Sequence, residues 1–192
     1  MKKVIFLVIL LVAAFVSTSH AWGTLTVFAG EKLTDSKQWK PVNEQFLKGV
    51  RLDLGDSTQF ANLALDYYIS TDEKLAFEND NLTNFVAKTE EIRIGIRSYF
   101  GQKIRLFGAG GIANITSSLS KQSARGENIC HGSTGYNLFS NGVWIEAGAD
   151  YAIGNIFIAG LSASYSEGRI KCDGKNHQIG GVNIGAYFGI SF

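Results

Sequence analysis

Two cysteines and two histidines are the residues best suited to covalent or metal chemistry. Cys130 and Cys172 are the two cysteines of the chain, and each falls in a polar segment between apolar stretches. In an oxidising compartment one pair of cysteines allows one intramolecular disulfide, which we favour over free thiols. His131 and His177 lie near them in sequence, so zinc ligation remains an alternative, although a structural zinc site takes four ligands. The sequence therefore predicts a Cys130–Cys172 disulfide, with no resident metal ion and no cofactor.

Serine and histidine side chains raise the question of acyl-transfer chemistry. A serine nucleophile needs an imidazole base within hydrogen-bonding reach, and that base is oriented by an acid. Ser133 lies two residues from His131, and Ser164 or Ser166 would approach His177 only across neighbouring strands. No spacing in the chain fixes either geometry. We interpret these side chains as solvated loop residues and predict no catalytic site.

Eight charged residues form the largest candidate polar cluster. They alternate with apolar residues in segments that have the pattern of β-strands, where successive side chains point to opposite faces. If the apolar face is turned outward, the eight share one interior, and because both signs are present they can pair. This predicted interior network consists of Arg51, Asp53, Asp66, Glu91, Arg93, Arg97, Glu146 and Asp150.

Eight alternating segments must position these side chains. The last is the clearest, because every second residue from Val182 to Phe192 is apolar and the residues between them are small or polar, apart from Tyr187. The same period of two predicts strands over residues 24–33, 46–54, 59–70, 85–100, 103–118, 142–153, 156–166 and 178–192. In the fifth segment the apolar parity changes around Gly110 and Gly111, where we expect a β-bulge.

The connections between these segments alternate in length. Tight turns are predicted at residues 55–58, 101–102 and 154–155, and long connections at 34–45, 71–84, 119–141 and 167–177. An up-and-down barrel with short periplasmic turns and long outer loops has this rhythm. After residue 21 no apolar run approaches the roughly 18 residues of a membrane helix, so any span must be a strand.

The fold class predicted is therefore all-β, an eight-stranded antiparallel up-and-down transmembrane β-barrel. The alternative is a soluble barrel of the lipocalin type, which would turn its apolar wall inward around a ligand. Such a barrel should carry many charges on its outer wall. Here the opposite wall is largely Gly, Ser and Ala, with a few charges of both signs.

The first 21 residues have the features of a secretory signal peptide. Lys2 and Lys3 precede an apolar run that ends at Val16, and small or polar residues follow as far as Ala21. That run would rise only about 20 Å as a helix, too short to anchor the chain across a hydrocarbon core of about 30 Å. We predict a signal peptide over residues 1–21, a barrel domain over residues 22–192, and integration into the bacterial outer membrane. The chain has 18 Lys and Arg against 17 Asp and Glu, so no basic excess points to nucleic acid.

The signal segment, the eight strands, the alternating connections and the terminal aromatic strand together resemble the small eight-stranded outer-membrane barrels of the OmpA and OmpX type, with the OmpW type as a relative. The likeness covers residues 22–192. Phe188, Ile190 and Phe192 resemble the C-terminal signal that the barrel-assembly machinery recognises in this class. The resemblance implies contact with outer-membrane lipid, lipopolysaccharide and that machinery.

The interior of an eight-stranded barrel is just wide enough for side chains to fill it. We therefore predict a closed barrel, not an enzyme, that acts in envelope structure or recognises an external ligand or surface through its outer loops. Porin-like transport of small or apolar solutes, as suggested for OmpW-type barrels, is one alternative. A lipid A-modifying enzyme with His131 or His177 as its base is another.

Overall fold

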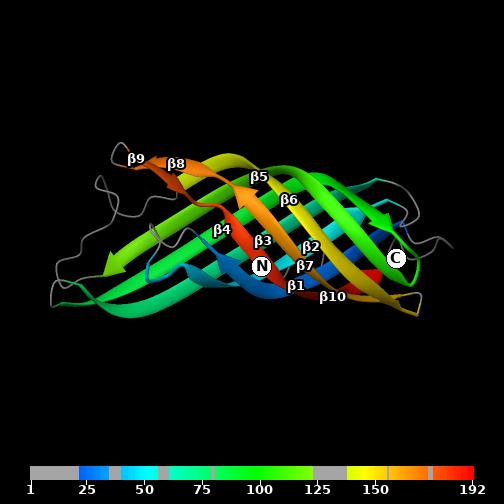
Figure 1. Cartoon of the computed structure of the whole chain (residues 1–192), viewed down its shortest axis with the longest axis horizontal. Helices are drawn as coiled ribbons and strands as arrows, with labels where there is room; N and C mark the ends of the chain where they lie inside the picture. The colour runs from blue at the N-terminus through cyan, green and yellow to red at the C-terminus, as the bar shows by residue number, and fades with distance from the viewer. Residues whose placement is uncertain are drawn as a thin grey trace, which may run out of the picture.

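The structure, a computed structural model, describes residues 22–34, 40–55, 61–78, 81–122, 138–154, 156–172 and 175–192. The predicted signal peptide lies outside these residues. Eight strands form a closed barrel in the order β1-β10-β7-β6-β5-β4-β3-β2, and two short strands form a separate hairpin (Figure 1). The barrel strands are β1 Gly23–Leu33, β2 Glu44–Leu54, β3 Asn62–Glu78, β4 Asn81–Phe100, β5 Ile104–Gln122, β6 Leu138–Ile153, β7 Phe157–Glu167 and β10 Gly181–Ser191. The hairpin strands are β8 Arg169–Cys172 and β9 Lys175–Gln178.

The predicted fold class is confirmed, because each of the eight predicted strands has its counterpart in the barrel. Every neighbouring pair is antiparallel, and the first and last strands close the ring with a register from Thr24↔Ser191 to Leu33↔Val182. Closure leaves the ring without an edge that could pair with another chain. In the described part of the chain, no helix is long and apolar enough to cross a membrane.

The outer wall of the barrel is apolar on all eight strands, apart from the exposed Glu31 and Lys48 toward its outer end. Val27 on β1, Ile112 on β5 and Leu161 on β7 are 60%, 65% and 67% exposed. On β6 the apolar wall runs from Val143 to Ile153, about 33 Å along the strand and about 25 Å along the barrel axis at a tilt of about 40°. That is the height of a lipid-facing belt. The lipocalin alternative is wrong, because the apolar wall faces outward and the charged side chains face inward.

Three strands extend well beyond this belt. β3, β4 and β5 have 17, 20 and 19 residues, whereas β1, β2, β7 and β10 have 11 each. β2 pairs with β3 only as far as Thr71, but β3 continues to pair with β4 as far as Glu78↔Asn81. Residues 72–78, 81–88 and 118–122 thus form a projecting sheet, which lies at the left of Figure 1.

The predicted long connection at residues 71–84 is therefore wrong. Most of it is strand, since β3 ends at Glu78 and β4 begins at Asn81. Asp72, Glu73 and Lys74 made this stretch resemble a loop, because polar residues on both faces hide the period of two. The strands remain paired here because each has a partner in the projecting sheet.

The predicted bulge in the fifth strand is also wrong. Gly110 pairs with Ile96 and Gly111 with Gly95, and the register with β4 continues through both glycines without an inserted residue. Ala113 and Ile115 point inward instead, and they are 3% and 0% exposed. Apolar residues of the fifth strand move from the outward face to the inward face here, because from this depth toward the outer end the interior of the barrel contains apolar side chains.

Candidate functional site

Among the described residues, ten charged side chains lie inside the barrel, and each is at most 6% exposed. The structure places all eight residues of the predicted network there. Lys32 and Arg105 join them and were not singled out from the sequence. The ten comprise five cations and five carboxylates, which occur in three layers along the barrel axis.

The outermost layer is built around the carboxylate of Glu91. Its two oxygens accept hydrogen bonds from Lys32 Nζ, from Ser166 Oγ at 3.2 Å, and from Arg93 Nε and Nη2 at 3.0 and 2.6 Å. Arg93 also donates through Nη1 to Ser164 Oγ at 2.9 Å. Burying a charge is costly unless it is paired and hydrogen-bonded, and both requirements are met here.

The middle layer is built around Arg97. Its guanidinium bonds to Asp53, to Asp66 Oδ2 at 3.0 Å and to Glu146 Oε2 at 2.8 Å. Arg51 approaches the other oxygen of Glu146 at 3.3 Å. β2, β3, β4 and β6 each contribute to this layer, so it ties together strands on both sides of the interior.

The innermost layer pairs Arg105 with Asp150. The guanidinium donates through Nε and Nη2 to the two carboxylate oxygens at 2.7 and 3.0 Å, a bidentate geometry. Tyr187 Oη donates to the same carboxylate at 3.2 Å, and the ring of Tyr99 lies 4.6 Å from the Arg105 guanidinium. This layer lies near the periplasmic end, where β5 begins.

Aromatic rings fill the spaces between the layers by lying over inward-facing glycines. A Cβ atom added at Gly49 would lie 2.4 Å from the ring of Tyr68, and one added at Gly160 would lie 2.5 Å from the ring of Tyr187. The same rings face cations, since the Arg93 guanidinium lies 4.7 Å from the Tyr68 ring centre. The glycines therefore provide space for rings in a narrow barrel, and the rings contact the buried arginines.

Apolar side chains lie beside the outermost charged layer and above it, toward the outer mouth. Trp144 is 1% exposed, and its indole Nε1 donates to the carbonyl of Ile94 at 3.4 Å. Val42, Phe85, Ala87, Ala113, Ile115 and Ile179 belong to the same cluster. Described side chains thus occupy the interior from the Arg105–Asp150 pair to this apolar cluster.

The candidate reactive residues fall mainly outside the described residues. Cys130, His131 and Ser133 lie in the undescribed segment 123–137, and the side chains of Cys172 and His177 are likewise not described. The disulfide therefore stays a prediction. Ser164 and Ser166 are described, and their hydroxyl groups bond to Arg93 and Glu91 inside the barrel. Among the described residues, no group of three or more His, Cys, Asp and Glu side chains is placed to hold a metal ion.

The predicted assembly signal lies at the strand that closes the barrel. Phe188 is 50% exposed on the outer wall and stacks on Phe157, with ring centres 5.8 Å apart. Phe192 meets Trp22 edge to face at 5.7 Å, so the two chain ends of the barrel are joined at the periplasmic rim. Recognition of these residues by assembly machinery stays a prediction.

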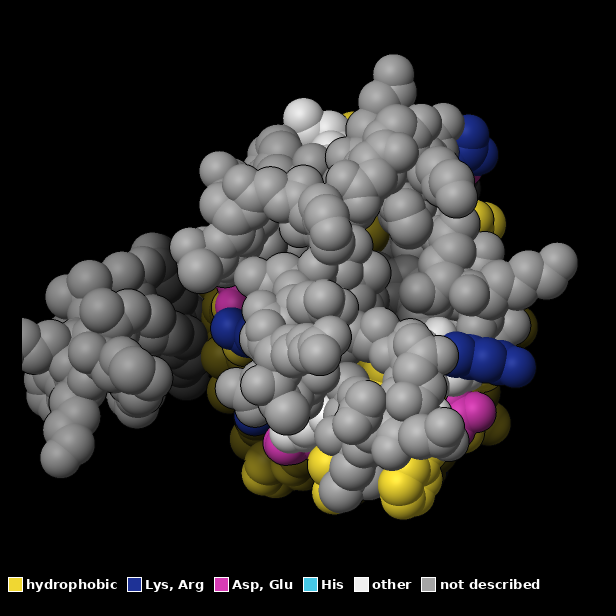
Figure 2. Space-filling view, turned by 90° about the vertical axis from the view of Figure 1, so that its left-hand side faces the viewer, with side chains coloured by type: hydrophobic (Ala, Val, Ile, Leu, Met, Phe, Trp, Pro, Cys, Tyr) yellow, Lys and Arg dark blue, Asp and Glu magenta, His cyan; other side chains and the backbone are white. Residues whose placement is uncertain are grey.

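The projecting sheet carries exposed apolar residues outside the belt. Leu75 is 68% exposed and Phe77 is 80% exposed on the outward face of β3. Among the described residues, the segment 72–78 of β3 pairs with β4 alone, so its other edge has no partner strand. Figure 2 looks toward this end and shows basic and acidic side chains close together at the rim. Lys88 and Glu90 form one such pair at 2.5 Å.

The closed ring, the apolar belt and the ion-paired interior define an integral membrane β-barrel. Comparison with solved structures then shows the particular fold, that of the small eight-stranded barrels of the bacterial outer membrane. The chain is similar to the Neisserial surface protein A (NspA), with a TM-score of 0.60 and 11% identity over 91% of this chain and all of that one. It is also similar to Ail, the attachment invasion locus protein of Yersinia pestis, with a TM-score of 0.57 and 13% identity over 88% of this chain and 97% of that one.

The outer membrane protein OprG of Pseudomonas aeruginosa has a TM-score of 0.53 and 12% identity over 90% of this chain and 95% of that one. At these identities the likeness is one of fold. No protein-family model matches the chain, and no curated protein matches it.

Proposed function

We propose that this protein is a closed, non-enzymatic outer-membrane barrel that recognises a protein on an external surface through its projecting sheet. The observation that carries the proposal is the packed interior. Three layers of paired charges, the rings between them and the apolar mouth occupy the space that a solute would need. The working surface of such a barrel is its outer end.

The outer end supports recognition of a polypeptide. Leu75 and Phe77 are large apolar side chains held outside the belt, where no lipid covers them. The edge of β3 beside them presents backbone groups that an extended segment can pair with, and alternate side chains of that segment would meet the exposed residues. An apolar, strand-like partner fits both features.

A polyanion fits this surface less well. Ail has been crystallised with the heparin analogue sucrose octasulfate, so a sulfated glycan is the natural comparison. In this protein three exposed cations near the outer end are each paired with a carboxylate two residues away. These pairs are Lys74 with Asp72, Lys88 with Glu90, and Arg169 with Glu167. Paired cations attract a polyanion only weakly.

Two other functions are less well supported. Transport of apolar solutes needs an apolar passage, but the described interior holds ten charges. For lipid A modification, the serines that could approach His177 are Ser164 and Ser166, and both hydroxyls are hydrogen-bonded within the barrel. The other candidate, Ser133 beside His131, lies outside the described residues. Unchanged lipid A mass in cells carrying His131→Ala and His177→Ala would be consistent with the proposal, and a changed mass would contradict it.

Two measurements test the proposed function. In planar bilayers the purified protein should show no single-channel steps, and a regular conductance would overturn the closed barrel. Cells that display the protein should adhere to a panel of immobilised surface proteins better than cells that display a variant with Leu75→Ser and Phe77→Ser. Thr71→Ala, on the same face but next to the belt, is the matched control. Adhesion that the double variant leaves unchanged would refute a role for the projecting sheet, and adhesion to heparin alone would favour a polyanion.

A further inference from the structure

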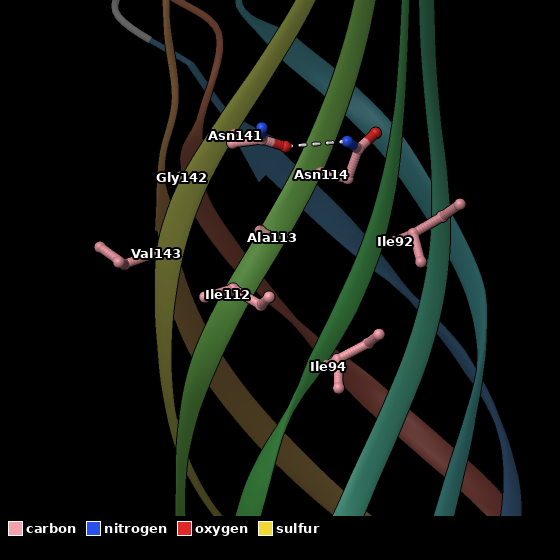
Figure 3. Close-up of a pocket in the computed structure, with 8 residues that line it drawn as sticks. All are labelled: Ile92, Ile94, Ile112, Ala113, Asn114, Asn141, Gly142 and Val143. Carbon is pink, nitrogen blue, oxygen red and sulfur yellow. Dashed lines mark hydrogen bonds between the residues drawn. The ribbon is translucent and has the colours of Figure 1, made fainter.

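A hollow in the outer wall, at the outward end of the belt, has no part in the proposed recognition. It has a volume of about 580 Å³ and lies across β4, β5 and β6 (Figure 3). Its sides are apolar and exposed, since Ile92 is 54% exposed, Ile112 is 65% exposed and Val143 is 57% exposed. The strand register places Ile94, Ile112 and Val143 in one row across the three strands.

The next row outward ends the apolar wall with two amides. Asn114 and Asn141 face each other on β5 and β6, and Asn114 Nδ2 donates to Asn141 Oδ1 at 3.1 Å, as the dashed line in Figure 3 shows. This bond uses one N–H group and one acceptor, so the pair keeps the rest of its donor and acceptor capacity. A hydrogen-bonding pair therefore stands at the boundary between hydrocarbon and headgroups.

The wall is recessed below this pair. Gly110 and Gly108 lie on the outward parity of β5, in line with Asn114 and Ile112. A Cβ atom added at Gly108 would meet nothing within 4 Å, and one added at Gly110 would come no closer than 3.3 Å to another atom. Neither close packing nor a left-handed backbone requires glycine at Gly108, whereas the Cβ at Gly110 would lie against the backbone carbonyl oxygen of Trp144. Ile112 stands between Asn114 and these glycines, and from Asn114 to Gly108 this outward row of β5 is about 20 Å long.

We propose that this hollow retains an acyl chain of lipid A, with the polar linkage of that chain against Asn114 and Asn141. The hollow is continuous with the lipid-facing belt, so its occupant at this depth is hydrocarbon. The amides stand at the end of the barrel from which the projecting sheet extends, opposite the termini and short turns, which is the outer-leaflet side. The acylated amphiphile of that leaflet is lipid A, whose ester and amide carbonyls and hydroxyl groups match the donors and acceptors of two asparagines.

The test measures lipid retained by the folded protein. Wild type, refolded in detergent, is mixed with equal amounts of purified lipid A and phosphatidylethanolamine, and bound lipid is counted by native mass spectrometry. We expect one lipid A per barrel. Ile112→Trp fills the hollow, and Asn114→Leu with Asn141→Leu removes the amides but keeps their size. Each should lower retained lipid A by about fivefold or more.

Val27→Trp is the matched control, because β1 lies opposite β5 in the ring and Val27 is similarly exposed on the belt. Heat-dependent electrophoretic mobility shows whether each variant is folded. If I112W does not fold, the asparagine variants alone provide the test. Equal loss in V27W, unchanged retention in the asparagine variants, or equal retention of phosphatidylethanolamine would overturn the proposal. None of these outcomes depends on adhesion, so the proposed function is tested separately.

Discussion

Replacing Arg97 with methionine tests whether the ion-paired interior stabilises the barrel. Arg97 is fully buried and is the cation that touches Asp53, Asp66 and Glu146 together. Methionine keeps a long side chain but removes the charge and all three contacts. Removing one partner of a buried ion pair costs about 3–5 kcal/mol, because the remaining charge is left uncompensated. We therefore expect R97M to lose at least that much free energy of unfolding.

The structure also predicts which second change restores stability. Arg97 is the hydrogen-bond partner of Asp66, whereas Asp53 also accepts from Thr24 and Tyr99, and Glu146 also pairs with Arg51. Asp66→Asn in the R97M background removes the carboxylate that R97M leaves without its hydrogen-bond partner. The double variant should recover about 1–2 kcal/mol, a coupling typical of residues in contact.

The assay is urea unfolding of the barrel in detergent micelles, followed by tryptophan fluorescence and by heat-dependent electrophoretic mobility. Lys88→Met is the matched control, because it breaks an exposed pair with Glu90 outside the belt and should change stability by less than about 1 kcal/mol. If R97M were no less stable than K88M, or if D66N made R97M still less stable, the reasoning from buried charge would be refuted.

Three further predictions concern packing, assembly and redox state. Gly160→Ala should destabilise the barrel by about 1–3 kcal/mol, because the added Cβ would lie 2.5 Å from a buried ring. Gly108→Ala is the control. Its Cβ would have nothing within 4 Å, so its free energy of unfolding in the same urea assay should differ from wild type by less than about 0.5 kcal/mol. Phe192→Ala should lower the amount of barrel inserted in cells while protein refolded in detergent keeps its heat-dependent shift; equal loss in both would mean that the residue acts through stability alone. The non-reduced protein should migrate faster than the reduced one after boiling, and the difference should vanish when Cys130 and Cys172 are replaced by serine.

Alternation in the sequence placed Arg51, Asp66 and Glu146 on the inward face, which is where the structure has them. It did not indicate which charge meets which, because pairing depends on the register between strands and on the reach of each side chain. Lys32 has the inward parity of the first strand but was not singled out beside the outward Glu31. Arg105 lies in the fifth strand, where the change of apolar parity around Gly110 and Gly111 obscures which face is inward.

The outer end was harder to predict than the belt. In the belt one face is uniformly apolar, so a period of two is visible, but in the projecting sheet both faces carry polar residues. Glycine also has a packing role in this barrel that composition alone does not show. The sequence indicated only that the inward wall is rich in Gly, Ser and Ala, whereas in the structure Gly49 and Gly160 each face an aromatic ring from a neighbouring strand. Contacts of this kind follow from the register and not from the pattern along one strand.

The balance of charge inside the barrel constrains how it can enter a membrane. Among the described residues, β1, β4 and β5 each carry one excess buried cation, β3 carries one excess carboxylate and β6 carries two, whereas the ten charges together cancel. A sheet of β1 to β5 without β6 would thus expose an excess of two cations to hydrocarbon, at a cost of several kcal/mol per ion. Glu146 and Asp150 of β6 neutralise this excess. Insertion should therefore be cooperative, with no stable membrane-embedded intermediate that lacks β6.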